Sequence, residues 1–414
     1  MNESMPESIV IIGAGATGFT AAKTLREKGF TGTVTLIGDE HAQPYRRPAV
    51  SKELLAGTKT IEQVLLGALA DEIDFRHGDT VVSISADEVV LDSGDRVPFD
   101  ALLLATGSRA RQLDHLDGAP VFTLRTASDI EPLHAEIRRT GSLLVIGSGL
   151  IGCEAAAVAR ELGAEATILS ADMPLSRIVP PAVSELYLNL HAEKGVAIHT
   201  GVTVAAVEKL PDGTVRAIAE DGRSWEAGTL LVAVGSVANA ELAAASGIET
   251  RAGIVVDAQM RTSSSHIYAA GDVAEVPNTI LGGTYRSEHW NGAIDQGAAA
   301  ARSMLGIGTD GLDVVDGLDV PWGWSNQYGV NLQFAGWTGA DDDYVVRGSI
   351  ADRRFTAFAL RGDKLVGAVG IGRPKDIRAV RALVADERPV DRALLADDNV
   401  DLTAVTVPFS GVRE

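Results

Sequence analysis

Short, continuous runs of apolar residues recur along the chain, and several of them end in glycine. Such runs lie at residues 9–12, 101–108, 229–236 and 266–274. A strand that is buried on both faces of a parallel sheet has this uninterrupted apolar pattern. The pattern therefore predicts short parallel strands that are followed by tight turns.

Two longer segments, residues 8–40 and 142–172, share one plan. In the first, an apolar strand is followed by a glycine turn, helical spacing over residues 18–28 and a second strand over 34–37, which is closed by Gly38 and Asp39. The second segment repeats this order. The pair predicts an internal duplication of a βαβ unit rather than a short-period repeat.

The remaining pattern indicates further elements. A helix is expected from about Asn291 to Met304, and the stretch 306–320, which is rich in glycine and aspartate, is expected to be a linker. Residues 330–336 and 355–372 are strand-like, and residues 374–387 are helical. We expect these last ninety or so residues to form a separate α/β or antiparallel-sheet domain.

Composition and charge exclude several classes. Lys and Arg number 36 against 56 Asp and Glu, which gives a net charge of −20 and argues against nucleic acid as a partner. No apolar run approaches the roughly 18 residues of a membrane helix. The N-terminus is acidic and polar without the marks of a secretory signal, so we expect a cytoplasmic protein. The single cysteine, Cys153, excludes an internal disulfide and a redox-active cysteine pair, and the eight histidines show no metal-ligand spacing.

Two G-x-G-x-x-G loops carry the candidate chemistry. Each follows a predicted strand and opens a predicted helix. In this context the first glycine permits a tight turn, the second lets the backbone approach a pyrophosphate, and the third lets the helix pack on the strand. The loops consist of Gly13, Gly15 and Gly18, and of Gly147, Gly149 and Gly152.

The residues expected to contact the adenosine ribose of a bound dinucleotide differ between the two units. Asp39 ends the second strand of the first unit and can accept from both ribose hydroxyls of an adenosine. Ser170 holds the equivalent place in the second unit, with Asp172 two residues further on, and Arg177 could reach a phosphate. Two dinucleotides in one chain indicate electron relay, with tightly bound FAD and transient nicotinamide as the commonest pairing. The choice between NADH and NADPH stays open at this position, with a preference for NADH.

Several longer motifs together resemble one family. They are "PYRRPAVSKELLAG" (44–57), "ATGSRAR" (105–111), "GSGLIGCE" (147–154), "AAGDVA" (269–274), "SEHWNGAIDQG" (287–297) and "PWGWSNQYGVNLQFAG" (321–336). In order, from about residue 8 to residue 405, the chain resembles the FAD-dependent NAD(P)H:ferredoxin reductases of bacterial oxygenase systems. The glycine loops are shared with a wider set of flavoproteins, whereas the motifs at 44–57 and 321–336 are specific to this group.

The resemblance implies a fold of the α/β class, with two Rossmann-like dinucleotide-binding domains as in glutathione reductase and a C-terminal α+β domain. The implied FAD domain covers residues 1–112 and 241–318, the NAD(P)H domain residues 113–240, and the C-terminal domain beside the flavin residues 319–414.

The resemblance also implies roles for individual residues. Lys52 is expected to approach flavin N5 as a catalytic group and to pair with Glu154, because an ammonium stabilises anionic reduced flavin and a carboxylate offsets the cost of burying it. Beyond the two glycine loops, the expected cofactor-binding residues are Ala16, Thr17, Asp39, Arg47, Lys52, Val82, Ala105, Thr106, Gly107, Arg109, Leu150, Ile151, Ser170, Gly235, Asp272, Glu288, His289, Trp290 and Trp322. No metal site is expected.

The chain departs from the family pattern at three places. Asn326 stands where the family usually has Asp, Ala49 and Val50 stand within "RPAVSK" where "RPPLSK" is usual, and Ser170 replaces an acid. The first change removes a charge expected beside the flavin, and the last weakens the inherited preference for NADH.

The resemblance implies that electrons pass from NAD(P)H through FAD to a [2Fe-2S] ferredoxin that serves a monooxygenase or dioxygenase. Such ferredoxins are acidic, so a local basic dock is required, for which we consider Arg373, Lys375, Arg378 and Arg381. A solvated helix face explains these cations equally well. The alternatives are an NADH oxidase or quinone reductase, or a redox-sensing flavoprotein resembling apoptosis-inducing factor.

Overall fold

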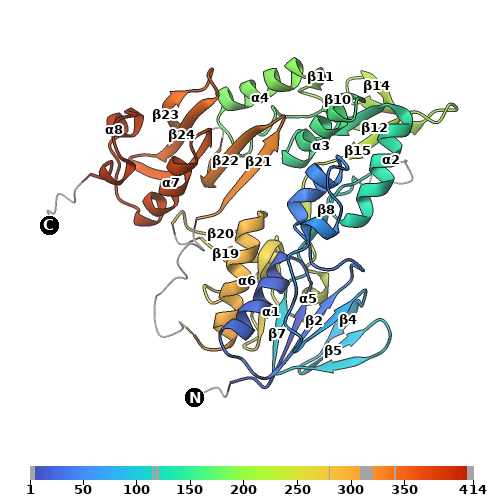
Figure 1. Ribbon diagram of the computed structural model, residues 1–414, viewed down its shortest axis with the longest axis vertical. Helices are drawn as coiled ribbons and strands as arrows, with labels where there is room; N and C mark the ends of the chain where they lie inside the picture. Colours follow the sequence, from blue (N-terminus) through green and yellow to red (C-terminus); the bar gives the residue numbers. More distant parts are fainter. Residues whose placement is uncertain are drawn as a thin grey trace. The chain divides into compact units, whose positions relative to one another are not determined.

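The computed structural model describes residues 5–113, 116, 121–278, 280–307, 320–339 and 342–407. It divides into two compact units (Figure 1). Unit 1 comprises Met1–Pro48, Thr60–Arg109 and Ser236–Pro321, and unit 2 comprises Ala49–Lys59, Ala110–Gly235 and Trp322–Glu414. The two units are described separately below.

A five-stranded sheet forms the centre of unit 1, with all strands parallel. In sheet order its strands are β18 (Ile267–Ala269), β7 (Ala101–Leu104), β1 (Ser8–Ile12), β2 (Thr33–Gly38) and β3 (Ile73–His77). Three of the predicted apolar runs form β1, β7 and the edge strand β18, and their apolar side chains are buried.

Helices α1 (Ala16–Glu27) and α6 (Trp290–Met304) pack against each other beside this sheet (Figure 1). A Cβ atom at Gly297 of α6 would lie 2.4 Å from the carbonyl oxygen of Thr17, so glycine permits the close approach. Unit 1 also contains two smaller sheets and a short helix. The first sheet is an antiparallel meander of β4 (Val81–Ile84), β5 (Glu88–Leu91) and β6 (Arg96–Pro98). The second consists of β17 (Ile254–Val255), β19 (Ala274–Pro277) and β20 (Thr284–Tyr285), and the helix is α5 (Glu241–Ala245). Short 3-10 helices are Arg47–Ala49, Glu62–Val64 and Gly271–Val273, and the short strands β8 (Ser108–Ala110) and β16 (Ser236–Ala238) complete this part of the chain.

Unit 2 repeats the parallel plan with one strand fewer. Its sheet runs β11 (Val196–His199), β10 (Glu165–Leu169), β9 (Ser142–Ile146) and β15 (Thr229–Val232), all parallel. The helices are α2 (Ile130–Thr140), α3 (Leu150–Glu161) and α4 (Pro181–Glu193), and a meander is formed by β12 (Val204–Lys209), β13 (Val215–Ala219) and β14 (Ser224–Ala227). When the strands of each sheet are numbered in chain order, both sheets contain the spatial order 3-2-1-4: β3-β2-β1-β7 in unit 1 and β11-β10-β9-β15 in unit 2. This shared order confirms the predicted duplication.

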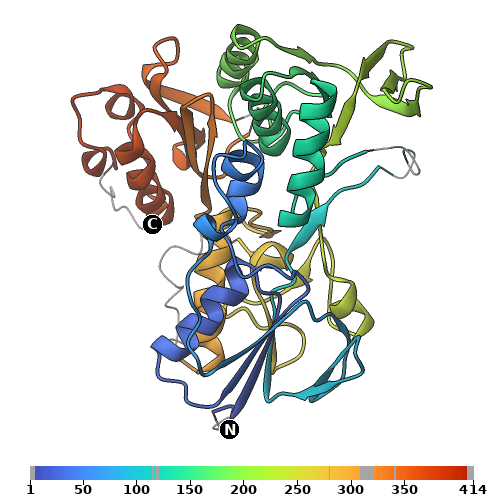
Figure 2. The same ribbon diagram turned by 45° about the vertical axis from the view of Figure 1, so that its right-hand side comes forward.

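The C-terminal part of unit 2 is a five-stranded antiparallel sheet with helices beside it (Figure 2). Its order is β21 (Trp322–Gln327), β22 (Val330–Gly336), β25 (Lys364–Ile371), β24 (Arg354–Arg361) and β23 (Asp343–Ser349), followed by α7 (Pro374–Asp386), α8 (Arg392–Ala396) and a 3-10 turn at Leu402–Ala404. Unit 2 also contains the π-helix η2 (Val50–Leu54) and a 3-10 turn at Ala127–Asp129.

The predicted elements compare closely with those observed. The first helix begins at Ala16 rather than residue 18, because the third glycine of the loop lies inside the first helical turn. Most of the predicted linker, with the boundary at 318–319, lies outside the described residues. Within the described part of the chain, no helix combines the length and the apolar character needed to cross a membrane.

Candidate dinucleotide and electron-transfer site

The first glycine loop has the geometry of a phosphate cradle. Gly13 adopts φ +108°, and its N–H donates to the Ile37 carbonyl oxygen at 2.7 Å. A Cβ atom at Gly13 would lie 2.1 Å from the Ala105 carbonyl oxygen, and one at Gly18 would lie 1.9 Å from Gly13 O. In the described structure, the first turn of α1 has neither a capping side chain nor an acidic residue. Its N–H groups and positive helix end are therefore suited to an anion.

Acidic and basic side chains surround this loop. Asp39 is exposed directly after β2, as predicted. The Nη2 atom of Arg47 lies 4.0 Å from the Cβ position of Gly15, and the Arg47 guanidinium donates to Glu40 Oε1 at 2.5 Å and to the Tyr45 hydroxyl at 3.1 Å. Burial lowers the pKa of Arg47, but the neighbouring Tyr45, Glu40 and Asp272 outweigh it and raise that pKa above its usual value.

Asp272 follows the end of β18 at the carboxyl edge of the same sheet. It is nearly buried, and its Oδ2 accepts from the Ser108 hydroxyl at 3.0 Å. Gly271 has φ +81°, and a Cβ there would meet the Thr17 hydroxyl at 2.2 Å, so the turn before Asp272 is held against α1. The sheet edge thus brings together the loop, Arg47 and Asp272, at the place where open α/β sheets bind ligands.

The other predicted residues of unit 1 take varied positions. Ala16, Thr17 and Ala105 are buried, Val82 is exposed on β4, and Glu288 is exposed while His289 and Trp290 are half-buried at the start of α6. Thr106 and Gly107 exchange hydrogen bonds with Asn239, with Thr106 Oγ1 donating to Asn239 O at 2.8 Å. Arg109 is half exposed and forms an ion pair with Glu241 at 2.7 Å.

His289 caps the amino end of α6. Burial lowers the pKa of its imidazole, partly offset by the carboxylates of Asp272 and Glu288. This shift favours the neutral imidazole at neutral pH.

The second glycine loop repeats the backbone geometry of the first. Gly147 also has φ +108°, and its N–H donates to Leu169 O at 2.8 Å. A Cβ at Gly147 would lie 2.3 Å from Ala233 O, and one at Gly152 would lie 2.1 Å from Gly147 O. In the described residues, α3 again begins without a capping side chain or an acid in its first turn.

The surroundings of this second loop are more open. Gly149 is exposed, and among the described residues no heavy atom lies within 4 Å of its Cβ position beyond its chain neighbours. Leu150 is half-buried, whereas Ile151 and Gly235 are exposed, and Gly235 has φ +111°.

Ser170 directly follows the end of β10. It is buried, and its Oγ lies 2.7 Å from the Ser148 Oγ within the glycine loop. The Ser170 hydroxyl therefore ties the strand end to the loop. Asp172 and Arg177 are the exposed charged side chains that follow.

Unit 2 contains an ion pair between Lys52 and the buried Glu154. Lys52 Nζ is 2.6 Å from Glu154 Oε2, with 16% of the lysine side chain and 2% of the glutamate side chain exposed. The pairing expected from the resemblance is therefore present. Lys52 lies at a kink within η2, where its backbone leaves helical geometry (φ −126°, ψ −108°), and Glu154 lies on α3.

Two serine hydroxyls, which the sequence analysis did not identify, also donate hydrogen bonds to the Glu154 carboxylate. Ser51 Oγ donates to Oε2 at 2.5 Å and Ser325 Oγ donates to Oε1 at 2.6 Å. Ser51 is the direct neighbour of Lys52, and Ser325 lies in the motif at 321–336, so a search of the quoted motifs for hydroxyl donors could have found both.

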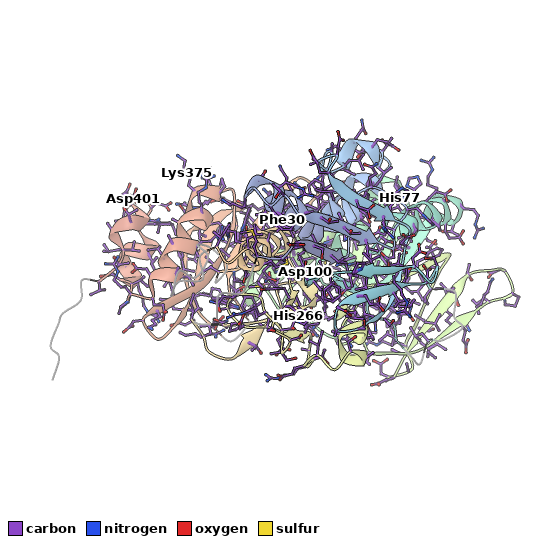
Figure 3. All side chains as sticks on the ribbon, turned by 90° about the horizontal axis from the view of Figure 1, so that it is seen from below. Phe30, His77, Asp100, His266, Lys375 and Asp401 are labelled. Carbon is purple, nitrogen blue, oxygen red and sulfur yellow. The ribbon has the colours of Figure 1, made fainter. Side chains whose placement is uncertain are left out.

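The remaining candidates lie in the C-terminal part of unit 2. Trp322 lies under the Arg381 guanidinium at 5.7 Å from its ring centroid and beside Trp324. Arg373 forms ion pairs with Asp376 at 2.6 Å and Asp398 at 2.8 Å. Lys375 and Arg378 are exposed on α7, and Figure 3 shows Lys375 projecting from its helix.

Cys153 is inert as a nucleophile. It is fully buried on α3, and burial and the neighbouring Glu154 carboxylate raise the pKa of its thiol well above the usual range. Within the described residues, no group of three metal-ligating side chains is gathered.

Two glycine-rich turns of the same geometry, each opening a helix at the carboxyl edge of a parallel sheet, define the class. The molecule contains two Rossmann-like units, each of the kind that binds a dinucleotide. The model of the pyridine nucleotide-disulphide oxidoreductases matches residues 7–297, and that of the reductase C-terminal family matches residues 322–406. The chain belongs to the pyridine nucleotide-disulphide oxidoreductase family.

Individual relatives match over nearly the whole chain. Rhodocoxin reductase of Rhodococcus erythropolis is 37% identical, covering 95% of this chain and 93% of the relative. The 3-phenylpropionate/cinnamic acid dioxygenase ferredoxin–NAD(+) reductase component of Photorhabdus laumondii is 33% identical, covering 93% and 98%. Putidaredoxin reductase in its covalent complex with putidaredoxin is 33% identical with a TM-score of 0.88, covering 96% and 97%.

These findings confirm the predicted fold class and the predicted family, and with them that the chain is an oxidoreductase. They also support FAD and a pyridine nucleotide as the cofactor and the substrate. The individual site residues and the domain boundaries stay predictions.

Proposed function

We propose that this protein carries electrons from NADH through FAD to a [2Fe-2S] ferredoxin that serves an oxygenase. The observation that supports this most is the pair of uncapped glycine loops at φ +108°, one in each unit, in a chain that resembles named ferredoxin reductases over nearly its full length. FAD, when bound, supplies the chemistry that converts hydride transfer into single-electron steps.

The first loop is proposed to hold FAD. Its N–H groups and helix end would receive the pyrophosphate, and Asp39 would accept from the ribose hydroxyls. Arg47, placed 4.0 Å from the Cβ position of Gly15, would bind a phosphate oxygen, and Asp272 would accept from the ribityl chain. The other cofactor-binding residues predicted in unit 1 belong to the same proposal.

The second loop is proposed to bind NADH. Its exposed Gly149 leaves room for a ligand that must enter and leave in each turnover. Asp172, exposed beyond the strand end, would disfavour the 2′-phosphate of NADPH by charge repulsion, and this supports NADH.

Lys52 is proposed to stabilise the reduced flavin through its ammonium group. The ion pair with Glu154 offsets the cost of removing the Lys52 charge from water. Lys52, Ser51 and Ser325 together satisfy the hydrogen-bonding capacity of the carboxylate. Lys52 and Glu154 thus supply fixed electrostatic support where negative charge develops.

The ferredoxin is proposed to dock on the α7 surface, for which Arg373, Lys375, Arg378 and Arg381 are the predicted residues. Lys375 and Arg378 are exposed and would steer an acidic partner, while Arg373 and Arg381 hold the surface in place through Asp376, Asp398 and Trp322. A cytoplasmic location is also part of the proposal.

Charge reversal tests this dock. The double variant Lys375→Glu and Arg378→Glu is expected to lower kcat/KM for ferredoxin about tenfold at low salt and to leave ferricyanide reduction unchanged. Arg138→Glu, a reversal of an exposed cation on α2, is the matched control and should affect neither. Equal loss in both assays, or an equal effect of the control, would remove α7 from the dock.

Steady-state reduction of ferricyanide and of several [2Fe-2S] ferredoxins, with NADH and NADPH compared side by side, tests the function as a whole. We expect a yellow protein that reduces at least one ferredoxin with NADH and reoxidises slowly with oxygen alone. Rapid turnover with oxygen or a quinone and none with any ferredoxin would instead indicate an oxidase or a quinone reductase.

A further inference from the structure

A chain of buried polar side chains leads away from Glu154 into unit 2. Ser325 Oγ, which donates to Glu154 Oε1, accepts from Gln327 Nε2 at 3.1 Å. Gln327 Oε1 lies 2.9 Å from His191 Nε2, and His191 Nδ1 lies 3.1 Å from the Tyr328 hydroxyl. Ser325, Gln327 and His191 are fully buried.

The direction of each hydrogen bond in this chain is determined by chemistry. An amide nitrogen can only donate, so Ser325 must accept from Gln327 and has its own proton left for Glu154. The amide oxygen of Gln327 can only accept, so His191 must carry its proton on Nε2. In the neutral ring Nδ1 then accepts from the Tyr328 hydroxyl, and every donor points toward Glu154.

The strand pattern explains how these groups meet. Ser325 and Gln327 are two residues apart on β21, so both point to the same face, which is buried. His191 comes from the last turn of α4, Glu154 from α3 and Lys52 from η2. Side chains of η2 and β21 therefore contact the Glu154 carboxylate of α3, and α4 is linked to it through Gln327.

We propose that Ser325, Gln327 and His191 are positioning residues, which hold Glu154 in one rotamer and through it place the Lys52 ammonium. This proposal rests on the proposed function, because Lys52 is the group that would act on the flavin. Lys52 is part exposed and has a flexible stem, so its position depends on a partner that cannot move. The relay supplies that rigidity, since each buried polar group is satisfied only in this one arrangement.

Nuclear magnetic resonance of ¹⁵N-labelled histidine tests the relay itself, with or without cofactor. We expect His191 in the intact protein to be the neutral Nε2–H tautomer at pH 7, and its signal is assigned by its loss in His191→Asn. A neutral Nδ1–H tautomer, or a fully protonated ring, would overturn the hydrogen-bond direction on which the proposal depends.

Variants test the positioning role. Ser325→Ala is expected to slow anaerobic flavin reduction by NADH about tenfold and to make the flavin midpoint potential more negative, because Lys52 would be less well placed beside the reduced anion. Ser325→Thr retains the hydroxyl and should recover most of both. Gln327→Met, similar in shape, should give a smaller loss in the same direction and provides the test if Ser325→Ala does not fold.

The matched control is Ser184→Ala on α4. Ser184 is also a buried serine, but among the described residues its hydroxyl has no hydrogen-bond partner, so removal should leave rate and potential unchanged. If Ser325→Ala reduces flavin at the normal rate and potential, the positioning role fails while the proposed function stands. If the unsubstituted protein shows no flavin reduction by NADH at all, the proposed function itself fails.

Discussion

The two glycine loops have the same backbone and different surroundings. Gly13 and Gly147 share φ +108°, and each would collide with a carbonyl oxygen of the neighbouring strand end if it carried a Cβ. Around the first loop stand Arg47, Asp39 and Asp272, whereas the second has an exposed Gly149 with open space about it.

One duplicated unit can thus serve two kinds of ligand. The backbone cradle is common because a pyrophosphate demands it. We expect retention to depend on the side chains near the cradle. Those at the first loop include the partly buried guanidinium of Arg47, whereas Gly149 of the second loop is exposed and, among the described residues, its Cβ position has open space around it. We therefore infer a resident nucleotide in the first and an exchanging nucleotide in the second.

The largest expected effects come from placing an acid at the second glycine of each loop. Gly15 and Gly149 have φ −70° and −72°, with extended ψ, so Asp fits without strain and is a good N-cap. Its carboxylate would repel a pyrophosphate. Gly15→Asp should yield folded, colourless protein, and Gly149→Asp should stay yellow but raise KM for NADH about a hundredfold.

Absorbance of the purified proteins and steady-state kinetics distinguish the two outcomes. Circular dichroism serves as the control for folding. Loss of flavin from both variants, or from neither, would contradict the assignment of one ligand to each loop.

The next largest effect concerns Lys52. Lys52→Met keeps the length of the side chain but leaves the Glu154 carboxylate buried without its counter-ion. Flavin reduction by NADH should slow by about 30-fold in stopped-flow measurements, with flavin still bound. An unchanged rate would exclude Lys52 from the site.

A smaller effect depends on pH. Burial lowers the pKa of His191 below its usual value of about 6.5. As the pH falls below about 6.5, the imidazole therefore binds a proton in the unfolded chain before it does so in the folded chain. The stability that this histidine contributes is present above that pH and is lost as the pH falls, by at most about 1.4 kcal/mol per pH unit.

The variant His191→Gln tests this dependence. Between pH 7 and pH 5.5 its melting temperature should fall less steeply than that of the unsubstituted protein, although it starts lower. Parallel curves would show that His191 is not held neutral in the folded state.

The smallest effect is expected at Ser170. Its hydroxyl is bonded to Ser148, so Ser170→Ala should cost about 1 kcal/mol of stability and change the ratio of NADH to NADPH activity less than threefold. Thermal unfolding and the two values of kcat/KM check this. A large change in the ratio would mean that Ser170 contacts the ribose directly.

The sequence predicted the parts of the fold that depend on local pattern. Continuous apolar runs and turn glycines located the central strands and both loops, because a buried parallel strand and a positive φ each restrict which residues fit. The pairing of Lys52 with Glu154 came from resemblance, since 102 residues separate them and spacing alone carries no such information.

The other features of the site depend on tertiary contacts, which local sequence patterns do not reveal. Ser51, Ser325 and Gln327 are ordinary polar residues until α3, η2 and β21 are brought together. The inward orientation of Ser170 likewise depends on Ser148 in a separate loop. Two of the four predicted docking cations proved to be engaged inside the domain, which a helical pattern cannot reveal.

Anaerobic stopped-flow absorbance at about 450 nm follows the flavin itself and so tests whether electrons pass from NADH to a ferredoxin through it. The yellow protein is mixed first with NADH and then with oxidised [2Fe-2S] ferredoxin. The account predicts bleaching on the first mixing, and on the second a recovery that reduces two ferredoxins for each flavin. Bleaching without any recovery by ferredoxin, or no bleaching by NADH, would contradict a relay between two nucleotides and an iron–sulfur partner.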